Sequence, residues 1–383
     1  MTLTRNFLAV SLAWLLVFVF STRMAPANKL VGHPHAVSRT VFFEEKSDFK
    51  PGRFFRTRLN SKNEITLSAE NGDFITSGSF TSPVMRSPFP LTELIPSWNV
   101  DVPTSTGFTV YMKLGEAGRE WTDWLYLGRY GLTPKISGKN ISSRGAEVDV
   151  DYLLLEKPFV YYQWRVELFS RRPNYIPRLK LFTVTLGNAS GDEELYKQFT
   201  PKPRPGNNWA RRLDVPYRSQ LHKDRAIPKR MRWAICCPVS VSMVLEFFGH
   251  DLATRKVCDL CFDHDYTMWG AWPRASQTLS RFGLRSYVMQ IRHFDEIKEF
   301  ISKGSPMIIS IRAKEGELTS PPYSQAPGHI LVISGLDKDE NVWVNDPYNL
   351  DGKSGPRKWT RKEIEKVLIA RGGVAIIAEK INH

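Results

Sequence analysis

The chain has 383 residues, of which 42% are hydrophobic and 24% charged, so it holds enough apolar material for more than one packed core. This composition excludes an intrinsically disordered chain and a small disulfide-stapled scaffold. With 53 Lys and Arg against 39 Asp and Glu, the formal net charge is +14, which favours anionic surroundings but does not define a fold.

Residues 1–27 have the pattern of an export signal. Arg5 gives a positive start, an uncharged apolar run extends over residues 7–20, and the small residues at 25–27 (APA) suit cleavage. The apolar run is shorter than the roughly 20 residues that a membrane-spanning helix needs. We therefore expect a secreted or periplasmic protein without an integral membrane domain after signal removal. An uncleaved signal anchor is the alternative.

Residues 28–197 show strand patterns and few helix signals. Residues 161–168 (YYQWRVEL), for example, alternate apolar and polar side chains with a period of two. Many short strands of this kind, separated by turn clusters, predict an antiparallel, jelly-roll-like β-sandwich that serves as an accessory domain. Its many aromatic residues suit a carbohydrate-stacking platform, although filling of the sheet faces is the favoured explanation.

Residues 198–212 (QFTPKPRPGNNWARR) are rich in proline and basic residues and predict a linker. From residue 213 to residue 383 the periodicity changes to a mixture of helix and strand, which predicts an α+β domain. We expect helices at 238–248, 273–282, 294–302 and after a capping box at Thr360, and strands at 284–291, 306–311, 329–334, 342–345 and 374–379.

Four residues of this second domain have the chemistry of a cysteine nucleophile and its helpers. Cys236 directly precedes a predicted helix, whose positive end favours a thiolate. His329 begins a strongly apolar strand, and Asp346 ends the next one, so a hairpin would bring them together. Gln220 precedes the cysteine and carries an amide that can reach an oxyanion. Each residue alone is more often structural, but their order favours a catalytic site.

The segments around these residues resemble the bacteriocin-processing type of papain-like cysteine peptidase, family thirty-nine of the cysteine peptidases. The matching segments are residues 213–220 (LDVPYRSQ), 236–245 (CCPVSVSMVL), 328–329 (GH) and 345–347 (NDP). The resemblance implies a papain-like fold with Cys236 as nucleophile, His329 as general base, Asp346 as its orienting group and Gln220 as oxyanion donor. It is closest to the stand-alone secreted bacterial members, which carry a β-rich N-terminal region.

All four cysteines lie close together in the sequence, and Cys237 stands where that family usually has Gly or Ser. Three roles are open for Cys237: a small packing residue, a disulfide partner for Cys258 or Cys261, or a thiol whose oxidation locks the site. We expect Cys236, and not Cys237, to be the nucleophile. In an exported protein, a local disulfide within the Cys258 and Cys261 pair or to Cys237 is the expected outcome. No complete set of zinc ligands accompanies these cysteines, so we expect neither metal nor cofactor.

Three aromatic residues, Trp269, Trp272 and Tyr323, are candidate walls of a substrate cleft, with packing an equally good explanation. The hypothesis is a secreted cysteine peptidase that hydrolyses a peptide or protein substrate. One alternative is a catalytically idle papain-like protein that binds anionic cell-wall or glycan ligands through its sandwich and basic surface. Another is an amide hydrolase or acyl transferase acting on cell-wall peptides. Nucleic acid is not an expected partner, because the basic residues are scattered.

Overall fold

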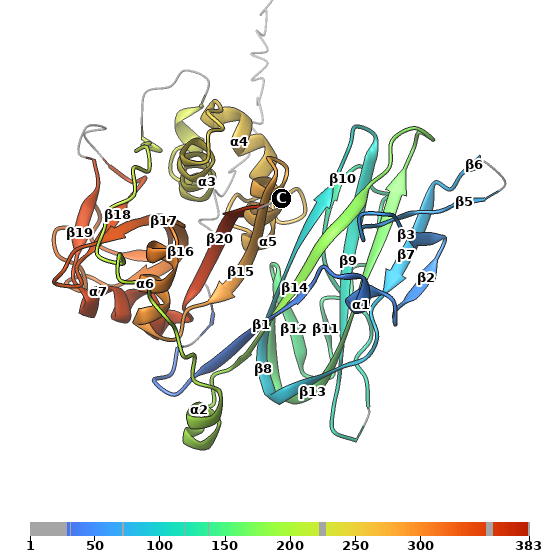
Figure 1. Ribbon diagram of the computed structural model, residues 1–383, viewed down its shortest axis with the longest axis horizontal. Helices are drawn as coiled ribbons and strands as arrows, with labels where there is room; N and C mark the ends of the chain where they lie inside the picture. The colour runs from blue at the N-terminus through green and yellow to red at the C-terminus, as the bar shows by residue number, and fades with distance from the viewer. Residues whose placement is uncertain are drawn as a thin grey trace, which may run out of the picture.

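The computed structural model describes residues 29–381 apart from 31, 71–72, 119, 137, 222–226 and 350–354. The predicted signal, residues 1–27, lies outside the described residues. An N-terminal part built of strands packs against a C-terminal part that contains a second sheet and most of the helices (Figure 1). Within the described ranges, none of the helices has the length and apolar character needed to cross a membrane.

The N-terminal part is a network of twelve strands whose pairs are all antiparallel. The long strand β13 pairs with β12 and β8 near its start and with β9 and β7 farther along. The strands are β1 (Val37–Phe43), β2 (Arg53–Phe55), β3 (Thr57–Leu59), β4 (Ile65–Leu67), β7 (Ser77–Thr81), β8 (Met85–Asp101), β9 (Thr106–Gly115), β10 (Leu125–Gly131), β11 (Ser142–Ser143), β12 (Ala146–Asp149), β13 (Tyr152–Ser170) and β14 (Arg178–Asn188). The β-rich prediction is confirmed, whereas the two-layered sandwich stays a prediction because the pairing connects all twelve strands.

Smaller elements complete this part. They are the strand pair β5 (Ala69–Glu70) and β6 (Asp73–Phe74), the short helix α1 (Lys46–Phe49) and the helix α2 (Glu193–Phe199). Helix α2 begins after the side-chain cap Asp192 and was missed by the sequence analysis, which placed the linker over its last two residues. Trp98, Tyr126, Tyr130 and Trp164 are buried, so these four aromatic residues pack the interior.

The C-terminal part contains a six-stranded antiparallel sheet with the order β15-β20-β16-β17-β18-β19. Its strands are β15 (Leu284–Gln290), β16 (Met307–Ala313), β17 (Ala326–Leu336), β18 (Val342–Asn345), β19 (Arg357–Trp359) and β20 (Val374–Lys380). Its helices are α3 (Cys236–Phe247), α4 (Thr254–Cys261), α5 (Trp272–Ser280), α6 (Phe294–Ser302) and α7 (Arg361–Val367), with short 3-10 turns at Lys229–Met231 and Ile369–Arg371. Every helix and strand that the sequence analysis predicted for this part is present. The sequence analysis did not predict α4 and β19.

The outer edge of β15 is covered by polar side chains of the N-terminal part. The amide of Asn99 donates to the carbonyl of Ser286 (2.7 Å) and accepts from its N–H (3.0 Å). Ser97 accepts from the N–H of Val288 (2.9 Å), and Thr185 donates to its carbonyl (2.7 Å). Side chains of β8 and β14 thus replace a further strand and satisfy an otherwise unpaired sheet edge.

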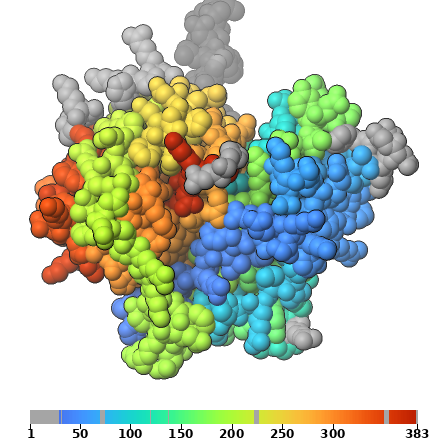
Figure 2. Space-filling model, viewed as in Figure 1, coloured from blue at the N-terminus to red at the C-terminus, as the bar shows by residue number. Residues whose placement is uncertain are grey.

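Two more buried polar contacts join the parts. Glu93 and Arg292 form an ion pair of 2.6 Å with both side chains almost fully buried, and Gln290 donates to the same carboxylate (2.7 Å). The amide of Gln277 on α5 bonds both backbone groups of Val100 (2.9 and 2.6 Å). In Figure 2 the yellow-green segment that connects the parts, residues 200–212, lies along the surface of the C-terminal part. The connection between the parts is therefore specific and extensive.

Candidate active site

Cys236 is the first residue of α3, two positions earlier than the sequence analysis placed the helix start. Proline at Pro238 is compatible with this start, because a proline in the first turn loses no helical hydrogen bond. The hydroxyl of Ser240, one turn later, donates to the carbonyl of Ile330 on β17 (3.1 Å). This bond fixes the helix against the strand that carries His329. The partly exposed Cys236 sulfur therefore lies at the positive end of a helix dipole.

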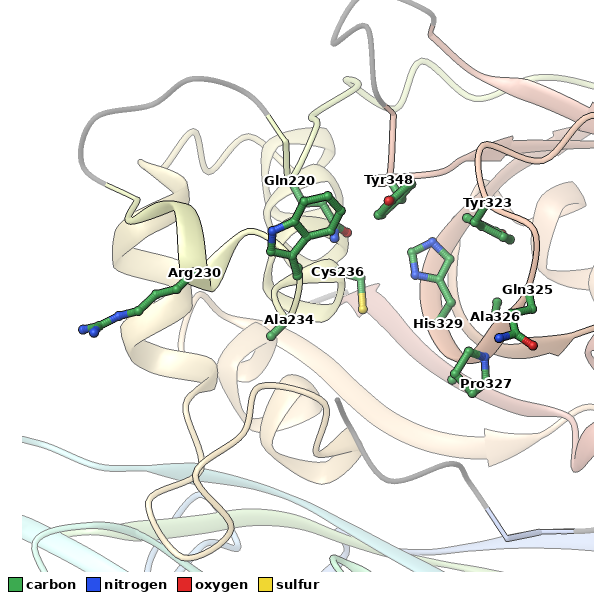
Figure 3. Close-up of a pocket in the computed structure, with 12 residues that line it drawn as sticks. Gln220, Arg230, Ala234, Cys236, Tyr323, Gln325, Ala326, Pro327, His329 and Tyr348 are labelled. Carbon is green, nitrogen blue, oxygen red and sulfur yellow. The ribbon is translucent and has the colours of Figure 1, made fainter. Parts of the chain in front are cut away.

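His329 and Asp346 are buried and joined by a hydrogen bond of 2.7 Å between Nε2 and Oδ1. The other side of the imidazole faces the sulfur of Cys236 (Figure 3). Burial alone would lower the pKa of His329, but the Asp346 carboxylate and then Cys236 raise it to about 10. The imidazole thus favours the protonated form, which stabilises a thiolate at Cys236.

Gln220 lies in the same pocket and is almost fully buried. Its backbone N–H donates to the carbonyl of Pro347 (2.8 Å), directly after Asp346, and its side-chain Nε2 donates to the carbonyl of Arg232 (2.8 Å). An amide nitrogen carries two hydrogens, so one remains for another acceptor. Three of the predicted residues, Gln220, Cys236 and His329, therefore line one pocket, and the fourth, Asp346, is buried and bonded to His329.

The pocket is an open cleft of about 580 Å³, lined mainly by apolar surface. The Tyr323 and Tyr348 rings both meet the His329 ring edge-on, with centroids 5.2 and 6.5 Å away. Trp233, 61% exposed, lies 5.8 Å from the ring of Tyr348. The sequence analysis missed Trp233 and Tyr348, although both stand within three positions of a predicted catalytic residue. The lining residues are Gln220, Arg230, Trp233, Ala234, Cys236, Tyr323, Gln325, Ala326, Pro327, Gly328, His329 and Tyr348.

The three aromatic residues predicted as cleft walls have different positions. Tyr323 lines the cleft, and burial together with the neighbouring Asp346 raises the pKa of its hydroxyl far above the ordinary value. Trp272 lines a smaller hollow on another side of Cys236. Trp269 lines neither: its indole N–H donates to the carbonyl of Cys258 (3.0 Å). Trp269 is therefore placed as a packing residue.

All four cysteines are free thiols, so the expected local disulfide is not formed. Cys237, Cys258 and Cys261, here called the buried thiols, point into the apolar core. Burial raises the pKa of Cys237 well above its ordinary value, and it raises the pKa of Cys258 and Cys261 to about 12. Such thiols remain protonated and unreactive at neutral pH. In the part of the chain that the structure describes, no cluster of three or more His, Cys, Asp or Glu residues suits a metal ion.

A cysteine at a helix start, beside a buried histidine and carboxylate in an open cleft, is the arrangement of a cysteine-type hydrolase. Residues 212–376 match the family described as Peptidase_C39 like family, and residues 41–187 match the Peptidase C39 N-terminal domain. The two matches together span most of the sequence. The C-terminal part is therefore a peptidase C39-like domain, and the protein is a cysteine peptidase.

Three solved structures are similar to parts of this chain. A double glycine motif protease from an AMS/PCAT transporter, in complex with its leader peptide, is 16% identical and covers 47% of this chain and 100% of its own, with a TM-score of 0.30. A family two carbohydrate esterase from Cellvibrio japonicus is 12% identical (55% and 50% covered, TM-score 0.18). A carbohydrate-binding module from the β-sandwich superfamily is 11% identical (43% and 61% covered, TM-score 0.16). No curated protein matches the sequence.

Proposed function

We propose that the protein is an exported cysteine peptidase in which Cys236 is the nucleophile, His329 the general base and Asp346 the group that orients it. The observation that carries this proposal is the position of the His329 ring between two partners. Its Nε2 lies 2.7 Å from Asp346, and its other side faces the sulfur of Cys236 at the start of α3. This is the order of groups that a thiolate mechanism needs.

In the proposed reaction the Cys236 thiolate attacks the scissile carbonyl. The resulting oxyanion accepts hydrogen bonds from the backbone N–H of Cys236 and from the free hydrogen of the Gln220 amide. His329, already protonated in the ion pair, donates its proton to the leaving amine. Water, deprotonated by the now neutral imidazole, then cleaves the thioester and releases the acid product. Asp346 keeps the imidazole in the orientation that both proton transfers require.

The proposal extends to the organisation of the chain. Residues 28–197 act as a β-sandwich accessory domain, 198–212 as a linker and 213–383 as a papain-like α+β domain. The change of partners along β13, from β12 and β8 to β9 and β7, supports a two-layered arrangement. Export rests on the pattern of residues 1–27, and the net charge of +14 favours an anionic cell-wall or glycan surface as surroundings.

The first test is the pH dependence of iodoacetamide labelling of the mature protein, located by mass spectrometry of its peptides. The thiolate is the form that reacts, and the protonated His329 ring beside the sulfur favours it, so we expect Cys236 to be labelled selectively at acidic pH. The matched control is Cys237→Ala, which removes the adjacent thiol and should leave this profile unchanged.

Labelling of Cys236 only at alkaline pH would overturn the catalytic assignment. Labelling at acidic pH without hydrolysis of any peptide in a broad library would instead favour the idle protein that binds wall polymers. In that case Cys236→Ala would retain the same affinity for isolated cell wall as the unaltered protein.

A further inference from the structure

Cys236 and His329 lie where two hollows meet. The larger is the open cleft of about 580 Å³, and the smaller has a volume of about 50 Å³. Ala234, Cys236, Gly328 and His329 line both. A peptide that crosses the sulfur would therefore have the large cleft on one side of the scissile bond and the small hollow on the other.

The N-terminal part provides one wall of the small hollow. The turn between β12 and β13, residues 149–152, lines it together with Met268 and Trp272 of the C-terminal part. Val150, at the tip of this turn, packs with Met268 and Ala271 in a small apolar cluster. A residue far from Cys236 in the sequence thus reaches the surroundings of the nucleophile.

The turn is held in a conformation that its sequence does not favour. Val150 has a φ of 64°, which is strained for a β-branched residue and is tolerated where the surroundings determine it. Tyr152 stacks on Trp272 with centroids 5.2 Å apart, and its hydroxyl donates to Asp149 (2.8 Å). The side chain of Asp151 is buried next to the backbone of Trp272. These contacts bind the turn to the start of α5.

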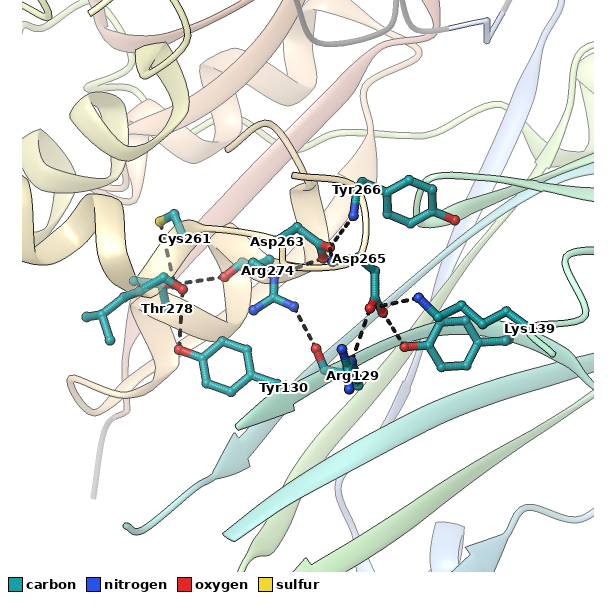
Figure 4. Close-up of polar contacts among 11 residues, drawn as sticks. Arg129, Tyr130, Lys139, Cys261, Asp263, Asp265, Tyr266, Arg274 and Thr278 are labelled. Atoms are coloured by element: carbon teal, nitrogen blue, oxygen red, sulfur yellow. Dashed lines mark hydrogen bonds and ion pairs between the residues drawn. The ribbon is translucent and has the colours of Figure 1, made fainter. Parts of the chain in front are cut away.

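The loop that carries Met268 is also held by the N-terminal part. Arg129 of β10 (3.1 Å) and Lys139 (2.7 Å) both form ion pairs with Asp265 in the loop before α5 (Figure 4). In the same loop Asp263 pairs with Arg274 of α5 (3.0 Å), whose guanidinium also donates to the carbonyl of Arg129 (2.6 Å). The turn and the loop that carries Met268 are therefore both held by contacts with the N-terminal sheet.

We propose that the turn between β12 and β13 is part of the substrate cleft and that Val150 sets the size limit for the substrate side chain on this side of the scissile bond. The inference rests on the proposed peptidase function. A single water needs about 10–15 Å³, so the hollow holds only a few water-sized groups. Its lining includes Val150, Met268, Trp272 and Ile330, and the only carboxylates on it belong to the turn. The hollow suits a short side chain of a few heavy atoms, and its mainly apolar lining favours an uncharged one.

The test compares cleavage of a diverse peptide library by the unaltered protein, Val150→Gly and Val84→Ala, with cut sites read by mass spectrometry. Glycine removes the side chain and the backbone strain together, so the variant should fold, and Val150→Ala is the second variant of the same position. Val84 is 53% exposed in the same part of the chain, which makes Val84→Ala the matched control.

We expect the unaltered protein and Val84→Ala to require a short uncharged residue at one position beside the cut. Val150→Gly should accept Leu and Phe at that position, with cleavage rates raised about tenfold or more, and should keep the preference on the other side of the bond. An unchanged cut-site profile in both Val150 variants would overturn the inference and leave the peptidase function standing. Absence of cleavage by all four proteins, with Cys236 still alkylated, would overturn the peptidase function and this inference with it.

Discussion

Replacing Asn99 by alanine should weaken the connection between the two parts of the chain. Asn99 is 4% exposed, and its amide satisfies both the N–H and the carbonyl of Ser286, which is fully buried. Alanine leaves these two backbone groups without a partner. Because each unpaired buried polar group costs about 1–3 kcal/mol, we expect the free energy of unfolding to fall by about 2–6 kcal/mol.

Urea unfolding followed by tryptophan fluorescence measures this loss. A chain with two parts can unfold in more than one step, so the midpoint of each transition is compared between proteins. The matched control is Asn174→Ala, because Asn174 is exposed and the substitution removes the same side chain. A change within about 0.5 kcal/mol for Asn99→Ala, equal to that of an ordinary surface substitution, would refute the assignment of these side chains as a cover for the β15 edge.

Three further predictions concern the ionisable groups. Burial lowers the pKa of His329, but Asp346 and Cys236 raise it to about 10. Because the protonated ring donates to the leaving amine, the rate of peptide hydrolysis should fall only as the pH rises through about 10. A fall in this rate centred near pH 6.5 would contradict the prediction. Arg292→Met leaves Glu93 buried and unpaired, so unfolding should become easier by about 3–5 kcal/mol, and adding Glu93→Leu should restore part of the loss in a double-mutant cycle. Iodoacetamide at neutral pH should label Cys236 alone in the folded protein and all four cysteines in urea. Labelling of any buried thiol in the folded protein would contradict this prediction.

The sequence predicted elements best where local signals define both ends. The helix expected at 294–302 is found as α6 (Phe294–Ser302), where Glu296 completes a capping box, and the helix after Thr360 begins with the predicted capping box. Helix α4 was missed because it begins after Ala253, which provides no side-chain cap. The three-residue strand β19 is too short to show a period.

The candidate site was predictable because each of its residues lies in its own local motif. The positions of Cys236 before a helix and His329 in an apolar strand are visible in the sequence, and the structure adds their contact. Trp233 and Tyr348 were not predicted as cleft residues, because their exposure at the rim depends on how distant segments fold. Val150 was not predicted either, because its proposed role depends on contacts with residues more than a hundred positions away.

The N-terminal part is attached to the C-terminal part at two places with different consequences. The contacts of β8 and β14 with β15 join the two sheets, whereas β10 and the turn before β13 hold the walls of the small hollow. Both sets of contacts belong to one strand network. Loosening the contacts of β8 and β14 with β15 therefore allows the turn before β13 to move away from the small hollow. Asn99→Ala should therefore relax the size limit that Val150 imposes, although Asn99 does not line the hollow. An unchanged cut-site profile for Asn99→Ala, measured with the same peptide library, would contradict this coupling between the two places.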